Sequence, residues 1–377
     1  MTTPISTDDI SSITNSWHAQ HRCYGPKMAV FSGGTGFNGL VKYMSHSLST
    51  NVAHILPISD SGGSTREIIR VLGGPAIGDI RSRLVRLADG FDEHYSATKH
   101  VLEHRIQLTS VEGARKEFET ILSGEHIIWL DNDGCNTLYT PSKLQIRMQT
   151  LLSFIRHFNK CCNEVHQCRD PQPSPSHTND DISANEGSHH NQVTSMFDFR
   201  GGSIGNFVLT GARLFFNSLD CAIQWFSTLA GLPPSASVLP VISGVSNRVT
   251  IAALLKNGDI IFGQNEISHP TPPLSSSSEV ISNSWHESSK VISNSWHESV
   301  SSCNVYDSQQ TMTYGEPLSS PISKIIYTDE DCDSEVAYSL NPFVVDALRN
   351  VDAIVSILYC IVLYVIVVAV VVVVVSS

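Results

Sequence analysis

The stretch whose residue types and spacing could do chemistry is KMAVFSGGTGFNGL, at positions 27–40. A short apolar run at 28–31 breaks into SGGTG, and a pattern with helical spacing begins at Phe37. Glycines adopt backbone conformations that let a phosphate approach the main chain, and the N–H groups at a helix N-terminus attract anions. A tight turn that binds nothing is the alternative, because the spacing is neither GxGxxG nor a Walker loop. We expect the ligand to be a nucleotide or a phosphorylated metabolite, held by Gly33, Gly34, Thr35 and Gly36.

A carboxylate follows the second apolar run, VAHILPIS at 52–59. Asp60 opens a second glycine turn, near the place where dinucleotide folds carry the acidic residue that reads ribose hydroxyls. A carboxylate at the end of a strand can also hold a divalent metal, whereas an Asx-turn or a helix N-cap is the alternative without function. We favour a functional Asp60, because the second turn, with Gly62, Gly63 and Ser64, stands beside the first.

Cations near the start of a helix form the next candidate. In GGPAIGDIRSRL, at 73–84, we expect Asp79 to cap a helix over 80–87 that carries Arg81 and Arg83 in its first turn. The helix dipole disfavours cations there. The two arginines therefore indicate a compensating anion, either a bound phosphate or a neighbouring carboxylate. Gly78 precedes them in the same turn.

A third glycine turn, FRGGSIGNF at 199–207, leads into the apolar helical run 208–216. Its polar and glycine residues are Ser203, Gly205 and Asn206. In an open parallel sheet, turns that each lead from a strand to a helix gather at the C-terminal edge, where ligands bind. Three such turns in one chain predict one shared site.

Composition narrows the class of ligand. The chain has 377 residues and a net charge of −12, with no basic cluster, so we expect no nucleic acid partner. No GxSxG or HExxH occurs, which leaves serine hydrolysis and zinc proteolysis without support. The nine cysteines include one tight group, CCNEVHQC at 161–168, which we interpret as reduced thiols rather than a metal site. Arginines near the glycine turns suit a small anion; they are Arg66, Arg70, Arg81, Arg83 and Arg86.

The elements that must position these residues follow from the apolar pattern. Residues 1–26 indicate a flexible N-terminus, and 27–160 alternate strand-like and helix-like runs, as in a parallel α/β sheet. The polar stretches 163–196 and 271–312 predict disordered inserts, the second containing the repeat VISNSWHES. Residues 353–375 carry no charge and are rich in valine. This tail is either a C-terminal membrane anchor or a buried strand followed by residues foreign to the fold.

Five segments together resemble the 2-phospho-L-lactate transferase (CofD-like) family, in particular its eukaryotic members of poorly defined function. The resemblance covers most of 27–355, and residues 356–377 stand where a further turn and helix of the family are expected. It implies one Rossmann-like domain, a three-layer α/β sandwich with a mostly parallel sheet. The segments are SGGTGFNGL (32–40), HILPISDSGGSTREIIRVLGGPAIGDIRSRLVRLAD (54–89), FDFRGGSIGNFVLTGARLFF (197–216), SVLPVISG (237–244) and TIAALLKNGDIIFGQNEISHP (250–270).

The resemblance also implies an activity. Family transferases move a phospholactyl group from a nucleoside diphosphate-linked donor to a hydroxyl acceptor with magnesium, whereas other members resemble non-catalytic regulators that bind nucleotide sugars. Carried over by position, Asp60 would be catalytic and would hold the magnesium, and the first glycine loop would hold the diphosphate. We expect a cytoplasmic protein, with membrane attachment only through the tail, and a homodimer. The remaining pocket residues would be Gly62, Gly63, Ser64, Gly78, Asp79, Arg81, Ser203, Gly205 and Asn206.

Overall fold

The structure is a computed structural model of the 377-residue chain. It describes residues 25–33, 37–59, 62–88, 95–131, 133–141, 143–169, 196–243, 249–263, 267, 318–328, 335–349, 351–362 and 365–374. The first residues of the chain, most of both expected inserts and the repeat lie outside these ranges. The described residues form two compact units, one at 1–248 and 338–377 and the other at 249–337.

A five-stranded sheet organises the first unit, in the order β3-β2-β1-β7-β8. Strands β1, β2, β3 and β7 run parallel, and β8 pairs antiparallel to β7 at the edge. The chain leaves β1 toward β2 and β3 on one side, whereas β7 lies on the other side. The strand order therefore reverses at β1, the position where open α/β sheets bind ligands. The strands are β1 (Met28–Phe31), β2 (Val52–Leu56), β3 (Ser237–Pro240), β7 (Ala353–Val362) and β8 (Val365–Val374).

Helices cover both faces of this sheet. Ile55 of β2 joins a buried cluster with Ala29 and with Val344 of helix α12 (Pro342–Arg349). The neighbouring residue of the strand, His54, contacts Arg83 of helix α4 (Gly78–Leu87). Successive side chains of a strand point to opposite faces, so α12 and α4 lie on opposite sides of the sheet. The expected three-layer α/β class with a mostly parallel sheet is confirmed.

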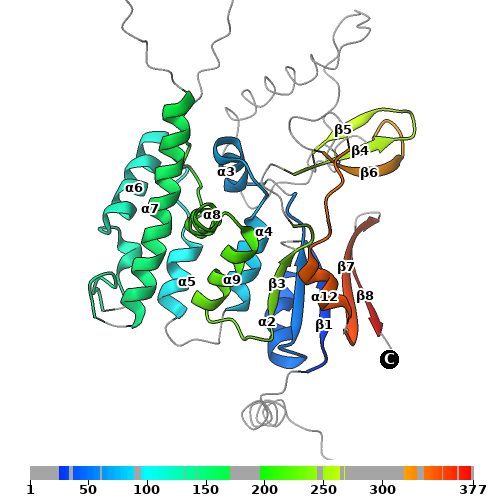
Figure 1. The fold of residues 1–377 in the computed structure, drawn as a ribbon, viewed down its shortest axis with the longest axis horizontal. Coiled ribbons are helices and arrows are strands. Elements are labelled where there is room, and N and C mark those ends of the chain that lie inside the picture. The colour runs from blue at the N-terminus through cyan, green and yellow to red at the C-terminus, as the bar shows by residue number, and fades with distance from the viewer. Residues whose placement is uncertain are drawn as a thin grey trace, which may run out of the picture. The chain divides into compact units, whose positions relative to one another are not determined.

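Helices alone connect β2 to β3 among the described residues, so the prediction of alternating strands and helices through residue 160 was wrong beyond β2. Short apolar runs in this region have helical spacing, and short runs are ambiguous between the two structures. Figure 1 shows α8 between the long green α7 and α9, with α9 next to β3. The other helices of the unit are α2 (Asn38–Ser47), α3 (Ser64–Leu72), α5 (Tyr95–Glu103), α6 (Val111–Ser123), α7 (Lys143–Arg169), α8 (Ile204–Phe216) and α9 (Leu219–Leu229), with the 3₁₀ helix η1 (Ile127–Trp129).

Two boundaries differ from the expectation. Helix α7 continues through Arg169, so the first polar insert begins after 169 rather than at 163. The apolar tail forms β7 and β8, which pair from Ala353 with Val374 to Val362 with Val365. The start of β7 agrees with the buried-strand alternative for this tail, because it pairs with β1 and its Val355 is buried.

No helix within the described ranges combines the length and apolar character that crossing a bilayer requires.

The second unit contains an antiparallel three-stranded sheet in the order β5-β4-β6. Strands β4 (Thr250–Leu255) and β5 (Ile260–Phe262) form a hairpin, and β6 (Ile322–Thr328) pairs with the other edge of β4. Gly258 has φ +94° in the hairpin turn, a conformation that favours glycine. The sequence predicts the parallel sheet of the first unit but not this antiparallel sheet.

Candidate functional site

Four helices that follow glycine-rich segments, α2, α3, α4 and α8, receive no side-chain cap from their own N-cap residues, Phe37, Gly63, Ile77 and Ser203. Elsewhere in the same unit, Ser110 caps α6 and Ser218 caps α9 by accepting backbone N–H groups. The first N–H groups of a helix lack partners within the helix, and a cap or a ligand can satisfy them. Since the described N-cap residues of these four helices leave the first N–H groups uncapped, an anionic ligand can satisfy them.

Arg83 ties the first glycine turn to the sheet. Its side chain is fully buried, and its Nη2 donates to Ser32 Oγ at 3.1 Å and to the Gly33 carbonyl oxygen at 3.3 Å. Its Nη1 lies 3.0 Å from Nδ1 of His54, and its guanidinium lies 4.9 Å from the centre of the Phe37 ring. These partners are neutral, so Arg83 places positive charge next to Ser32 and Gly33, where the first glycine turn begins.

Arg81 joins the second and third glycine turns. Its Nε donates to Asn206 Oδ1 at 3.0 Å, and Asn206 Nδ2 donates to Ser64 Oγ at 3.0 Å. The backbone N–H of Ser203 also points to Ser64 Oγ, at 3.4 Å. The starts of α3 and α8 are thus linked to α4, and the structure brings together the expected site residues Ser64, Arg81, Ser203 and Asn206.

Close backbone approach explains two of the glycines. A Cβ on Gly205 would lie 2.5 Å from the carbonyl oxygen of Leu102 and 2.9 Å from Cδ of Arg81. Gly63 has φ +56°, in the region that favours glycine, and a Cβ there would meet no atom of the described residues within 4 Å. Gly205 is therefore needed for packing, whereas Gly63 combines a special conformation with open space beside it. Gly62 precedes it, also exposed.

Helix α4 begins earlier than expected. Its first residue is Gly78 and its N-cap is Ile77, so the prediction that Asp79 caps the helix was wrong. A carboxylate is favourable both at an N-cap and within the first turn, and the same sequence signal therefore fits both positions. A Cβ on Gly78 would lie 2.8 Å from Thr65 Oγ1, so glycine allows the first residue of α4 to lie next to Thr65 of α3.

Four expected site residues, Gly34, Thr35, Gly36 and Asp60, lie outside the described residues.

Comparison with known proteins identifies the family to which this chain belongs. The family model described as 2-phospho-L-lactate transferase CofD matches residues 28–358. The chain belongs to the CofD family. The match begins at β1 and extends into β7, so it includes both compact units.

Several relatives of this CofD-family chain are also similar over shorter stretches. An uncharacterized protein of Saccharomyces cerevisiae is 35% identical over 257 residues, which is 67% of this chain and 48% of the yeast protein. The gluconeogenesis factor of Bacillus subtilis is 38% identical over 64 residues, 17% of this chain and 20% of that protein. A solved member of the UPF0052 family from Bacillus halodurans gives a TM-score of 0.43 at 14% identity, covering 88% of this chain and 58% of that one. The chain thus spans about half the length of the yeast relative.

The CofD-family site contains two buried polar atoms without hydrogen-bond partners among the described residues, Ser203 Oγ and Arg83 Nε. An unsatisfied buried group destabilises the fold unless a ligand or water meets it. No salt bridge within 4 Å joins Arg81 or Arg83 to a carboxylate of the described residues. Burial lowers the pKa of each guanidinium to about 10, so both remain charged at neutral pH.

Sequence reasoning noted Arg83 as a cation near a helix start but missed its partner His54. Burial, followed by the neighbouring charge of Arg83, lowers the pKa of His54 well below its usual value. A histidine inside an apolar strand was the available signal. With many histidines in the chain, that signal did not single out this one.

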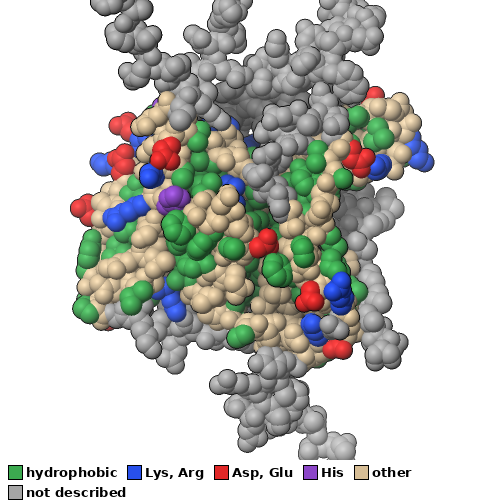
Figure 2. All heavy atoms as spheres, in the orientation of Figure 1, with side chains coloured by type: hydrophobic (Ala, Val, Ile, Leu, Met, Phe, Trp, Pro, Cys, Tyr) green, Lys and Arg blue, Asp and Glu red, His purple; other side chains and the backbone are tan. Residues whose placement is uncertain are grey.

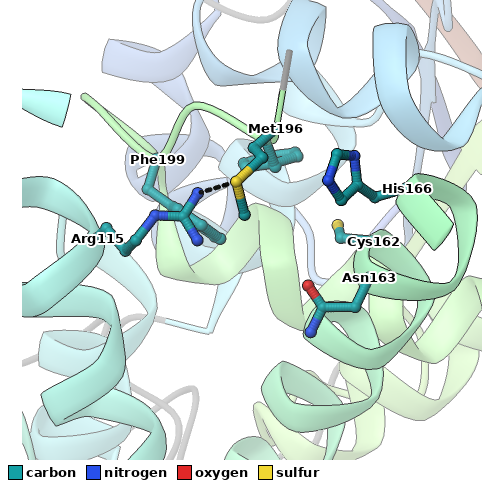
Figure 3. A pocket seen from close by; sticks show the side chains of 7 residues that line it. Arg115, Cys162, Asn163, His166, Met196 and Phe199 are labelled. Carbon is teal, nitrogen blue, oxygen red and sulfur yellow. Dashed lines mark hydrogen bonds between the residues drawn. The ribbon is translucent and has the colours of Figure 1, made fainter. Parts of the chain in front are cut away.

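The cysteine group of the CofD-family chain lies elsewhere. Figure 3 shows Cys162 and His166 on one helix beside a small hollow, across from Met196 and Phe199. Arg115 Nη2 lies 3.7 Å from Met196 Sδ at the same place. Burial raises the pKa of the Cys162 thiol, which keeps it protonated and makes it a poor metal ligand. Within the described ranges these residues form no group of three with metal-binding spacing.

Surface charge on the face in Figure 2 is mixed. Lys and Arg side chains of the described residues are scattered there among Asp and Glu rather than gathered in one area. The cations of the candidate site are instead buried or half-buried at the helix starts.

Proposed function

We propose that this chain binds a nucleoside diphosphate-linked donor at the glycine turns and transfers a phosphate-linked group from it to a hydroxyl acceptor. The observation that supports this proposal most strongly is the pairing of four uncapped helix starts with two charged arginines, Arg81 and Arg83. Membership of the CofD family supports a transferase-like role.

The surroundings of Arg81 and Arg83 bear on which anion compensates them, a bound phosphate or a neighbouring carboxylate. Neither forms a salt bridge with a described carboxylate, so a phosphate is the better candidate for the compensating charge. A diphosphate carries enough negative charge to engage several helix starts at once, and phosphoryl transfer depends mainly on such positioning and charge neutralisation.

The proposal includes a magnesium ion, with Asp60 as one of its ligands. The described side of the site offers guanidinium, hydroxyl and amide groups, a donor set that fits the phosphates. The oxygen ligands that magnesium prefers would come from Asp60 and from the donor itself. When bound, the ion would neutralise charge on the diphosphate.

The test is isothermal titration of the folded chain with guanosine and uridine diphosphate-linked metabolites, with and without magnesium. We expect saturable binding, and Arg81→Met should weaken it by about tenfold to a hundredfold, because a charged hydrogen bond contributes about 1.5–3 kcal/mol. Arg349→Met is the matched control: Arg349 is exposed at the end of α12, near the start of β7 and hence away from the carboxyl ends of the strands.

Absence of binding by the folded wild type, or equal affinity in the Arg81 and Arg349 variants, would reject the site. Transfer is tested separately. Asp60→Ala should abolish product formation while donor binding persists.

A second function is a regulator that binds nucleotide sugars without catalysis. The similarity to gluconeogenesis factors from Bacillus subtilis and a Nostoc species favours it. This alternative predicts tight binding of a nucleotide sugar and no transfer to any hydroxyl acceptor in a screen that includes magnesium.

A further inference from the structure

Three polar side chains near the third glycine turn form a cluster that is separate from the candidate ligand site. His104 follows α5, Glu117 lies in α6, and His126 precedes η1. His104 Nε2 lies 2.8 Å and His126 Nε2 lies 3.7 Å from the same oxygen, Glu117 Oε1. The two imidazole rings have centres 5.1 Å apart. Among the described residues this is the group of three with metal-binding spacing, its ligand atoms all within 4.8 Å of one another.

We propose that His104, Glu117 and His126 bind a divalent transition metal, with zinc the best match to this donor set. Two imidazoles and one carboxylate are a common zinc set, whereas magnesium and calcium prefer oxygen ligands alone. Around a tetrahedral zinc with bonds of about 2.0–2.2 Å, ligand atoms lie roughly 3.4 Å apart. The two distances to Glu117 Oε1 lie on either side of that separation.

The partial burial of the three side chains and the fixed orientation of the carboxylate suit metal binding. The three side chains are 15–20% exposed, so a metal could enter and keep a water molecule as a fourth ligand. The other oxygen of Glu117, Oε2, accepts the backbone N–H of Gln107 at 3.0 Å, which orients the carboxylate.

Metal binding has one structural consequence at His126. Its Nδ1 accepts the backbone N–H of Ile128 at 3.2 Å, which places the ring proton on Nε2 in the metal-free protein. Ligation through Nε2 moves this proton to Nδ1 and breaks the hydrogen bond with Ile128. The start of η1 must then adjust, next to the buried Trp129. Ligation also replaces the hydrogen bond between His104 Nε2 and Glu117 Oε1, and the proton between these atoms moves to Nδ1 of His104 or to solvent. Both hydrogen bonds are weak compared with zinc coordination, so the exchange favours the metal.

The cluster is connected to the ligand site through the backbone. The carbonyl oxygen of His104 accepts the N–H of Ile204, the first residue of α8. The N–H of Ile106 donates to the carbonyl oxygen of Gly202, and Arg105 pairs with Ser203 in an antiparallel bridge. A metal that fixes His104 to α6 would therefore hold the segment that carries the third glycine turn.

The experiment uses the full chain after chelation of metals. Titration with Zn²⁺ should give one tight equivalent per chain, and Co²⁺ alone should give the visible absorption of a tetrahedral complex. His104→Asn, Glu117→Gln and His126→Asn should each weaken Zn²⁺ binding by at least about tenfold. His157→Asn, which replaces a half-buried histidine of α7, should bind like the wild type. Lack of tight binding by the wild type, or equal loss in the control, would overturn the proposal.

Hydrogen exchange on the wild type keeps the test independent of variant folding. Zn²⁺ should speed exchange of the Ile128 amide, which loses its acceptor, and slow exchange across 104–107 and at the start of α8. An unchanged exchange pattern at saturating Zn²⁺ would contradict the assignment.

Discussion

At the scale of single residues, buried arginines define the candidate site. Arg83 contacts Ser32, Gly33 and His54, which are neutral, and therefore carries its charge without a carboxylate within salt-bridge distance among the described residues. A buried charge without a counter-ion is costly. The charge persists because the guanidinium holds its proton at neutral pH even after burial. Binding of an anion nearby would offset part of this cost.

His54 should make folding stability depend on pH. Burial and Arg83 lower its pKa below the value of about 6.5 expected in the unfolded chain. The unfolded chain therefore binds the proton first, and stability present above pH 6.5 is lost as the pH falls below it, with a slope of up to about 1.4 kcal/mol per pH unit.

Urea unfolding of the wild type and of His54→Gln between pH 5 and 7.5 measures this effect. Gln keeps an acceptor for Arg83 but does not titrate, so its curve should have the smaller slope. Identical slopes in the two proteins would show that His54 is not the responsible group.

At the scale of elements, the glycine turns and the helices that follow them behave as units. The sequence predicts β1, the start of α2 and the helical run of α8 correctly, because glycine punctuation and apolar spacing are local signals. It places the cap of α4 wrongly and expects strands where helices occur. An acidic residue near a helix start, and a short apolar run, each fit more than one local structure.

Helix α8 should be sensitive to any side chain at Gly205. Ala at this position would place its Cβ 2.5 Å from the Leu102 carbonyl oxygen, so the helix start must shift. We expect Gly205→Ala to lower the free energy of unfolding by about 1–3 kcal/mol and to weaken donor binding with it.

Gly39→Ala is the matched control for Gly205→Ala, because Gly39 is also helical and a Cβ there meets nothing within 4 Å. It should stabilise the protein by about 0.4–1 kcal/mol, since alanine favours a helix more than glycine. Chemical denaturation with titration of the ligand checks both. Equal stability of the two variants would refute the packing argument.

At the scale of the whole molecule, two compact units contain separate sheets. The larger unit holds the parallel sheet, the described glycine-turn residues and the His–Glu–His cluster. Its core includes the contact of α12 with β1 and β2 through Ala29, Ile55 and Val344. Packing of this cluster supports the strands from which the glycine turns emerge.

Ile55→Ala should lower the free energy of unfolding by about 2–5 kcal/mol, because it removes a buried side chain and leaves a cavity. Ile325→Ala in the second unit is the same chemical change at a position that is 49% exposed, and should stay within about 0.5 kcal/mol of the wild type. Differential scanning calorimetry compares the two. A larger loss at Ile325 would show that the core lies elsewhere.

The sequence by itself determined the glycine turns, the helices that follow them and the α/β class, because these depend on residues close together in the chain. The tertiary structure decided which side chains meet. Arg81 and Asn206 are 125 residues apart, and Arg83 and Ser32 are 51 apart. Neither pair has a spacing pattern, and the same holds for His104, Glu117 and His126. Such contacts depend on the order of strands in the sheet and on how helices pack across it, which local periodicity does not specify.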